Sequence, residues 1–341
     1  MLGKIFESLY VKVFVNIVVK RFSTVVYIET DGKKGLQRSA EEEFEVLELD
    51  EKMHDLITAF TKESPYNYVS VLDMSQSQGA VPTCKKNRIE YYTDVEDIEF
   101  RCHNNAWAYY TARENLTSIR KKYAAIGVDY IFSPFSILSY FFKDKIDGTL
   151  AMYILVQESF LSLAIFENSQ LLYAHHLDMM KKEDFDGIHL EDDENDGDLL
   201  LGEDDAIDLD DISLDDTEPG ELEDFANIED LDSIEDINEF SENQDIEEEL
   251  MESTDTLEEA DETQFNEDYQ RFTLIQGSVG EFYKDPRYES RFVENVYVAD
   301  AVGVTKEFKK YLEEEMFFNV YVRRTDLALE VCELAKEETG V

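Results

Sequence analysis

Cysteine is scarce in this sequence. The 341 residues include three cysteines, Cys84, Cys102 and Cys332, and no C-x-x-C spacing joins any two of them. An odd number of widely spaced cysteines fits neither a disulfide framework nor a zinc site. The sequence therefore predicts a protein of the reducing cytoplasm that holds no metal and no other cofactor.

Basic residues are missing from one long segment. Residues 183–270 contain 40 of the 79 acidic residues and none of the 31 lysines and arginines. The remainder has 39 acidic and 31 basic residues, a net charge of −8 against −48 for the whole chain. Because nucleic acids are held by clustered lysine and arginine, this balance argues against nucleic-acid binding.

Long hydrophobic runs are also missing. The apolar residues of the first 22 positions are interrupted by Lys4, Glu7, Lys12, Asn16 and Lys20. No stretch there is long enough for a signal sequence or a transmembrane helix. We therefore expect a first helix and strand and no direct membrane span.

Signatures of hydrolytic and metal catalysis are not found. The sequence has no G-x-S-x-G elbow and no recognisable serine, histidine and acid constellation. His175 and His176 are adjacent, so on a strand they would point to opposite faces and could not bind one metal together.

Strands and helices alternate along the part of the chain that is expected to fold. The pattern predicts a hairpin over 11–35, and a helix over 50–64 that is followed by a strand over 66–74. We expect a loop over 76–84 and a helix over 104–126. A strand and helix follow around Pro134, which suits the first turn of a helix.

The second half repeats this plan. A meander of three strands is predicted at about 149–157, 160–167 and 170–177. After the acidic segment, a helical or mixed stretch from about 268 precedes two strand and helix pairs that end near residue 338. A meander followed by helix and strand pairs in each half indicates an α/β protein with mixed sheets, built as duplicated ribonuclease-H-like lobes.

Two stretches resemble the actin-like platform proteins of type IV pilus and type II secretion systems, the PilM and GspL type. They are LAMYILVQESFLSLAIFENSQLLYAHHL from Leu150 and VENVYVADAVGVTKEFKKYLEEEMFFNVYV from Val293. YAAIGVDYIFSPFSILSYF, from Tyr123, is similar to the family's inter-lobe linker in a less specific way. The resemblance implies an actin-like first lobe at 1–130, a second lobe at 131–182 plus 271–341, and an acidic disordered insert at 183–270.

The resemblance also indicates where a nucleotide would bind. Actin-like ATPases place Asp and Gly at two phosphate turns, because the backbone approaches the phosphates closely and a carboxylate organises Mg²⁺. The corresponding turns here, near Asn16 to Arg21 and at Gln157 to Ser159, contain neither. The third, glycine-rich element keeps only Gly303. We therefore expect a protein that is not an enzyme, a pseudo-ATPase.

The acidic insert is expected to be disordered, since like charges repel and little apolar surface offsets the entropy of ordering. It nevertheless carries apolar residues at every third position, and these are the candidate partner-binding residues: Phe225, Ile228, Leu231, Ile234, Ile237 and Phe240. Such alternation is typical of segments that order on a partner, and the acidic residues predict a basic protein as that partner. The alternative is a solvated spacer.

The sequence thus predicts a non-catalytic cytoplasmic scaffold. Through protein–protein contacts, it would dock to inner-membrane assembly proteins of a pilus, competence or secretion machine. By the resemblance, the docking surface is an exposed edge or cleft of the first lobe. One alternative is a nucleotide-dependent actin-like ATPase with divergent loops. Another is an acidic regulator that binds a basic partner through its insert.

Overall fold

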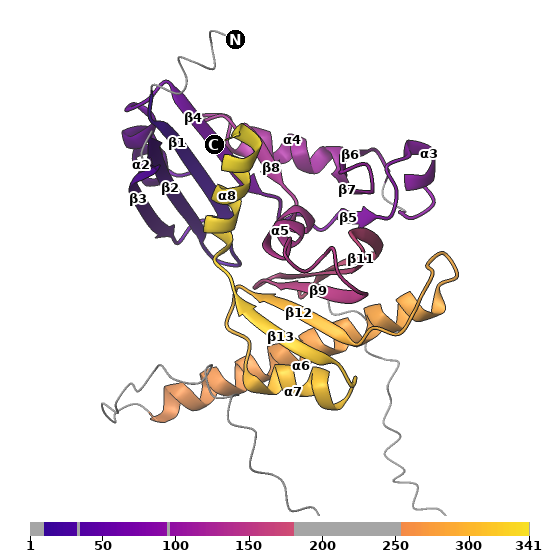
Figure 1. Ribbon diagram of the computed structural model, residues 1–341. Coiled ribbons are helices and arrows are strands. Elements are labelled where there is room, and N and C mark those ends of the chain that lie inside the picture. The colour runs from indigo at the N-terminus through magenta and orange to yellow at the C-terminus, as the bar shows by residue number, and fades with distance from the viewer. Residues whose placement is uncertain (1–9, 33–34, 94–95, 181–253, 341) are drawn as a thin grey trace, which may run out of the picture. The chain divides into compact units, whose positions relative to one another are not determined.

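The computed structural model describes residues 10–32, 35–93, 96–180 and 254–340, with side chains from residue 266 onward in the last range. The described helices and strands belong to one unit that spans residues 1–183 and 255–341. Figure 1 shows their arrangement.

Two five-stranded sheets share one strand order, β3-β2-β1-β4-β8 in the first and β11-β10-β9-β12-β13 in the second. In each sheet, three strands form an antiparallel meander, and two later strands add in parallel beside the first. This repeated topology confirms the predicted actin-like fold of duplicated ribonuclease-H-like lobes. The strands of the first sheet are β1 Lys12–Val19, β2 Thr24–Gly32, β3 Gly35–Phe44, β4 Tyr66–Leu72 and β8 Tyr130–Phe132. Those of the second sheet are β9 Ala151–Val156, β10 Phe160–Glu167, β11 Gln170–Asp178, β12 Asn295–Asp300 and β13 Asn319–Arg324.

The central strands are buried on both faces. All six residues of β9 and six consecutive residues of β1 are buried. Strands covered on both sides consist of continuous apolar, β-branched runs, as these do. The predicted meander is therefore confirmed, because its three apolar runs are separated by short polar turns.

The last helix of each half packs on the sheet of the other half. Helix α8, Leu327–Thr339, follows the second sheet but contacts β1, β2 and β4 of the first. Helix α5, Pro134–Phe141, follows the first sheet and contacts β9 and β10 of the second. Figure 1 shows α8 lying against the first sheet. One apolar cluster, which includes Phe14, Phe135, Tyr153 and Val331, therefore joins both halves.

Other helices cover the remaining faces of the two sheets. Helix α2, Glu51–Thr61, packs on β1 and β2 and is N-capped by Asp50. On the second sheet, α6, Thr254–Lys284, and α7, Lys306–Glu314, supply buried residues to a separate core that includes Phe282 and Phe308. Each sheet is thus enclosed between two apolar layers.

A third sheet corrects two predictions. It has three antiparallel strands in the order β5-β7-β6, and these are β5 Gln78–Val81, β6 Ile98–His103 and β7 Trp107–Ala112. The predicted loop over 76–84 therefore contains a strand. The helix predicted over 104–126 is wrong in its first third, since only α4, Arg113–Lys122, is helical there. Strand β7 pairs along both of its edges and buries Trp107 and Ala108, which outweighs the local helical pattern.

Two predicted boundaries fall inside regular elements. Strand β8 crosses the expected division between residues 130 and 131 and belongs to the first sheet. Helix α6 begins at Thr254, so the last part of the predicted insert, residues 254–270, is helical. Two acidic residues of this part are paired: Glu267 with Arg21, and the buried Asp268 with Arg271. Pairing compensates the charge of these two carboxylates.

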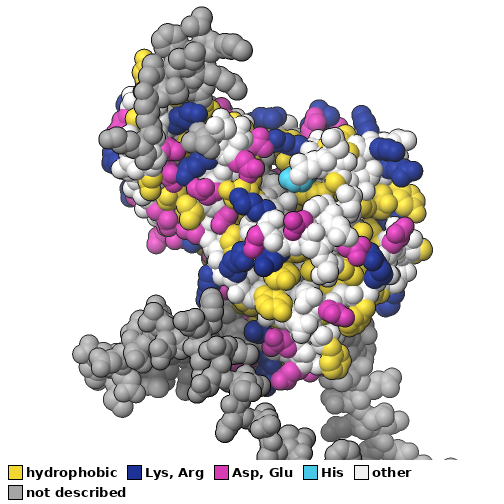
Figure 2. Space-filling view, in the orientation of Figure 1, with side chains coloured by type: hydrophobic (Ala, Val, Ile, Leu, Met, Phe, Trp, Pro, Cys, Tyr) yellow, Lys and Arg dark blue, Asp and Glu magenta, His cyan; other side chains and the backbone are white. Residues whose placement is uncertain are grey.

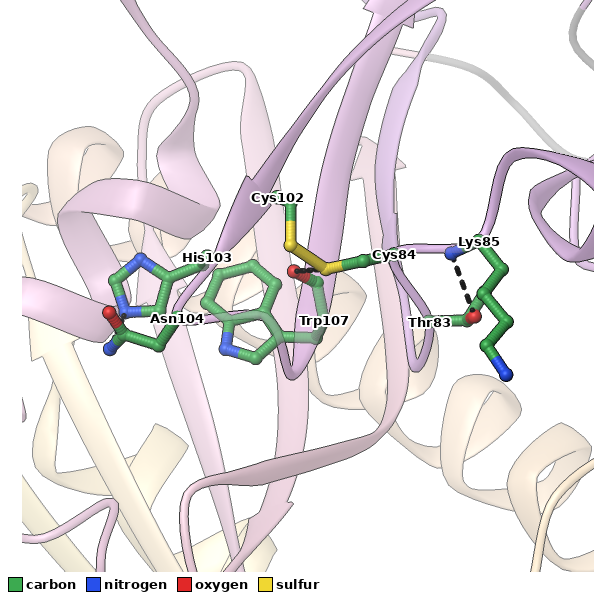
Figure 3. Close-up of a disulfide and its surroundings, with 7 residues drawn as sticks. All are labelled: Thr83, Cys84, Lys85, Cys102, His103, Asn104 and Trp107. Carbon is green, nitrogen blue, oxygen red and sulfur yellow. Dashed lines mark hydrogen bonds between the residues drawn. A yellow bond between two sulfur atoms is a disulfide. The ribbon is translucent and has the colours of Figure 1, made fainter.

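A disulfide joins Cys84 to Cys102 with the Cα atoms 5.3 Å apart, so the expectation that the cysteines form no disulfide is wrong. Cys84 follows β5 and Cys102 lies on β6, and both flank β7 (Figure 3). The Trp107 ring lies between the disulfide and the His103 ring (Figure 3). Helix α3, Lys86–Ile89, begins just after Cys84. Strand pairing brings the two sulfur atoms together, and sequence spacing carries no sign of it.

Candidate functional site

Three turns meet where the resemblance places a nucleotide. The residues are Lys20 at the end of β1, Gln157 to Ser159 between β9 and β10, and Ala301 and Val302 after β12. The cavity that they line, together with Met74 and Leu327, has a volume of only about 30 Å³. A pocket that holds a small-molecule ligand usually has several hundred Å³. The cavity that these three turns line is therefore far smaller than such a pocket.

The first two turns contact each other directly. The backbone N–H of Arg21 donates to Glu158 Oε2 at 3.1 Å. The Arg21 side chain reaches Glu267 on α6, with Nη1 and Oε1 3.2 Å apart. Arg21 therefore ties the β1–β2 turn to the β9–β10 turn and to α6.

Carboxylates occupy the backbone amides of the third turn. Asp300 Oδ1 accepts from the N–H groups of Val302, Gly303 and Val304 at 3.1, 2.8 and 3.2 Å. The next amide, that of Thr305, donates to Asp268 Oδ2 at 2.8 Å. Consecutive amides of this kind form an anion-binding concavity in phosphate-binding proteins. In this chain, the carboxylates of the two buried aspartates are the anions that these amides bind.

Charges of both signs meet at the junction. The carboxylates of Asp268 and Asp300 are paired with arginines: Arg271 Nη1 lies 2.5 Å from Asp268 Oδ1, and Arg324 Nη1 lies 3.2 Å from Asp300 Oδ2. Among the described residues, two buried donors, Arg21 Nε and Arg271 Nε, have no hydrogen-bond partner. The carboxylates of the junction are thus compensated by the protein's own cations.

Larger cavities flank the third sheet. One, of about 620 Å³, is lined by residues of β6, β7, α5 and the end of α8. The other, of about 180 Å³, lies between β6, β7, α4 and β8. Strand β8 is an edge of the first sheet and β6 is an edge of the third. The smaller cavity thus lies between two strand edges.

The larger cavity is polar and includes the disulfide. Its lining contains Cys102, His103, Trp107, Lys143 and Glu337. Burial lowers the pKa of His103, although Glu337 opposes that shift. Its ring lies against the Trp107 ring in a tilted arrangement, with the centroids 4.9 Å apart.

The smaller cavity has a buried carboxyl group among its lining residues. Asp73 follows β4 and is 1% exposed. Its Oδ1 accepts from the Ser75 N–H at 2.9 Å, whereas its Oδ2 has no hydrogen-bond partner. Burial raises the pKa of Asp73, and nearby hydroxyls of Ser75 and Thr111 reduce the shift. Sequence reasoning missed this residue, because a single aspartate after a strand has no motif.

Charge on the visible surface is mixed. In Figure 2, lysine and arginine are interspersed with aspartate and glutamate, and hydrophobic side chains lie between them. That face shows no basic patch of the size that a nucleic-acid backbone needs.

One serine, histidine and acid cluster is present that the sequence did not indicate. His175 Nδ1 lies 3.0 Å from Ser278 Oγ and 3.5 Å from Glu281 Oε2. A catalytic triad places the serine and the acid on different ring nitrogens. Here the serine and the acid both approach Nδ1, so the cluster does not have the geometry of a catalytic triad. It links β11 to α6. His176 points the other way, toward Ser162, which confirms the predicted opposite faces.

The six predicted partner-binding residues, Phe225 to Phe240, lie outside the described residues. Within the described ranges, no group of three or more His, Cys, Asp or Glu side chains is arranged to hold a metal ion. Among the described helices, none has the length and apolar character needed to cross a membrane.

Family comparisons match most of the chain. The family described as Domain of unknown function (DUF8341) matches residues 152–340. A second, Domain of unknown function (DUF8569), matches residues 10–139. No curated protein matches the sequence.

Several solved structures are similar in fold. A protein from Bacteroides thetaiotaomicron with an actin-like ATPase fold and unknown function has 11% identity, 97% coverage of both chains and a TM-score of 0.47. The PilM–PilN type IV pilus biogenesis complex has 12% identity over 48% of this chain and 61% of that chain, with a TM-score of 0.34. A Ppx/GppA family protein from Aquifex aeolicus has 7% identity over 50% and 52%, with a TM-score of 0.25.

Proposed function

Because the chain belongs to the family described as Domain of unknown function (DUF8341), whose description names no activity, we propose a function from the geometry: a non-catalytic scaffold that docks a partner protein. The actin-like lobes supply a rigid frame. Neither nucleotide binding nor hydrolysis is part of this function.

The observation that carries the proposal is the closed junction of the three turns. About 30 Å³ remains where an actin-like ATPase would hold a nucleotide. Asp300 and Asp268 occupy the amides of Val302 to Thr305, and Arg21 joins the other two turns. Opening the site would break these contacts and would place buried carboxylates beside a polyanion. The lost contacts and the charge repulsion would each cost free energy.

The docking surface that we assign is the first-lobe side of the third sheet. Among the described strands, β6 and β8 are each the last strand of their sheet, and the 180 Å³ cavity lies between them. An extended peptide can add to such an edge through its backbone while its side chains enter a neighbouring pocket. The sequence resemblance predicts a docking site in this lobe.

The same resemblance supports an inner-membrane pilus, competence or secretion complex as the partner and the cytoplasmic face of the membrane as the location. The Cys84–Cys102 disulfide removes the cysteine-based argument for a reducing compartment. The location therefore depends on the scaffold proposal alone.

Nucleotide binding gives the first test. We expect thermal melting and isothermal titration of the full chain to show neither a shift nor heat with Mg-ATP, with tripolyphosphate as the polyanion control. A saturable melting shift with ATP, absent with tripolyphosphate, would instead support the nucleotide-dependent alternative.

Docking is tested separately by photo-crosslinking in cells. A crosslinking residue at Arg120, which is exposed and lines the smaller cavity, should capture a membrane-associated protein. The same residue at Asp55, exposed on α2, is the matched control. Equal capture from both positions, or from neither, would contradict the assigned surface.

The acidic-regulator alternative is tested by deleting residues 183–253, a deletion that spares Glu267 and Asp268. Loss of capture at Arg120 in the deleted protein would favour the acidic regulator.

A further inference from the structure

The cavity between β6 and β8 has the chemistry of a cation pocket. We propose that it receives the lysine or arginine side chain of a partner peptide, and that Asp73 binds the charged end. This inference rests on the proposed docking function and names the chemistry of the residue that docks.

Asp73 is one of the buried residues that line the pocket. It is 1% exposed, and Ser133, which also lines the cavity, is 6% exposed. A buried carboxyl oxygen without a hydrogen bond costs free energy that a donor from outside would recover. Asp73 Oδ2 is such an oxygen.

The charges around the cavity favour one positive group. Four exposed charged residues line it, and they are Glu99, Arg101, Arg120 and Asp129. The charges of these four residues sum to zero, so the carboxylate of Asp73 determines the sign of the net charge that lines the cavity. Three of the four already have partners: Arg101 Nη2 lies 2.6 Å from Glu338, Glu99 Oε1 lies 2.7 Å from Arg113, and Asp129 Oδ2 accepts from the Val69 N–H at 2.8 Å.

The walls suit an alkyl stem with a charged end. Phe100, Tyr109 and Tyr110 contribute aromatic surface, and Leu116 and Ile131 contribute aliphatic surface. Aromatic faces attract ammonium and guanidinium groups, and the methylenes of lysine or arginine pack on apolar walls. A neutral donor would satisfy Asp73 Oδ2 but would leave the negative charge uncompensated.

The size and position of the cavity point to a side chain rather than a free metabolite. A volume of about 180 Å³ is below the usual range of small-molecule pockets, and it accommodates one long side chain. Strands β6 and β8, each the last described strand of its sheet, lie beside it, and such an edge can hold the backbone of the same peptide. The occupant to which the geometry points is an extended segment with one basic residue.

The test uses n-butylammonium as the lysine side-chain probe and n-butanol as its neutral analogue. The full-length protein is titrated with each while the backbone amide signals of Ser75 and Thr111 are followed by NMR. We expect saturable shifts with n-butylammonium and none with n-butanol. Asp73→Asn should weaken binding at least tenfold, whereas Asp55→Asn, at an exposed site, should leave it unchanged.

Three results would overturn the cation pocket: no saturable shift, equal shifts with the alcohol, or undiminished binding by Asp73→Asn. Val128→Trp, which fills the cavity from its wall and keeps Asp73, is the second variant and should also abolish binding. Failure of the cation pocket is distinguishable from failure of docking. If position 120 captures a protein but n-butylammonium does not bind, the docking proposal stands and the cation pocket fails. If n-butylammonium binds but position 120 captures no protein, the cation pocket stands and the docking proposal fails.

Discussion

At the residue scale, the contact of α8 with the first sheet depends on a buried ion pair. Lys336 Nζ binds Glu29, which is 3% exposed and also accepts a hydrogen bond from Tyr27 Oη at 3.0 Å. Removing one partner of a buried pair leaves the other charge uncompensated. Lys336→Met should therefore lower the free energy of unfolding by about 3–5 kcal/mol in urea denaturation.

Two comparisons make that measurement specific. The double variant Glu29→Gln, Lys336→Met should recover much of the loss, since no buried charge remains. Lys310→Met removes an exposed pair with Glu314 and should change stability by less than about 1 kcal/mol. If Lys336→Met behaves like Lys310→Met, the buried pair does not stabilise α8.

His176 makes stability depend on pH. Burial lowers its pKa to about 3, and the neighbouring His175 adds to the shift. The folded state therefore keeps His176 neutral, whereas the unfolded chain takes up a proton below about pH 6.5. This contribution to stability is complete above pH 6.5 and is lost as the pH falls toward 3, by about 1.4 kcal/mol per pH unit.

Urea denaturation between pH 4 and pH 7 measures this dependence. His176→Gln should make the free energy of unfolding depend less steeply on pH than in the natural sequence. A glutamine at position 176 binds no proton in either the folded or the unfolded state. His54→Gln, at a half-exposed position on α2, should leave the slope unchanged. Parallel curves for the natural sequence and His176→Gln would show that another group controls the acid response.

At the element scale, the third sheet is the part that depends most on a covalent link. Its own core cluster of buried residues is small, with Val81, Ile89 and Ala108, although its Ala80 and Trp107 belong to the cluster that joins both halves. The disulfide closes a loop over a sequence separation of 18 residues, for which chain entropy alone contributes about 3 kcal/mol. The double variant Cys84→Ser, Cys102→Ser should lose about 2–4 kcal/mol.

The loss should be local. Hydrogen exchange of the β6 amides should accelerate in the double variant, while exchange in β1 and β9 stays slow. Treating the natural protein with dithiothreitol should reproduce the effect, since it breaks the same bond. Unchanged exchange in β6 after reduction would mean that strand pairing holds the sheet without the disulfide.

Elements also show how far the sequence predicts the structure. The second-lobe meander was predictable because its apolar runs are local and polar turns divide them. Strand β7 was not, because one of its two partners is distant in sequence: Gln78 on β5 pairs with Thr111. Its other partner, β6, is joined to it by a tight turn between His103 and Trp107. At the closed junction, the positions of the turns were predictable from the family plan. The bond of Asp268 to Thr305, 37 residues away, was not.

At the scale of the whole molecule, the exchange of α5 and α8 makes the two halves one folding unit. The cluster with Phe14 of β1 and Tyr153 of β9 also contains Val331 of α8, which is fully buried. A defect on α8 should therefore unfold both sheets, although the helix belongs by sequence to the second half. Independent lobes would instead confine the damage to one sheet.

Val331→Asp tests this coupling. A charge in the shared cluster has no partner and costs several kcal/mol, so we expect a large loss of stability. Leu329→Asp, on the same helix with its side chain 39% exposed, should cost far less. Hydrogen exchange in β1 and in β9 should rise together in Val331→Asp, because the cluster spans both sheets. Acceleration in β1 alone would show that the halves open independently, and the scaffold would then be two hinged lobes rather than one rigid frame.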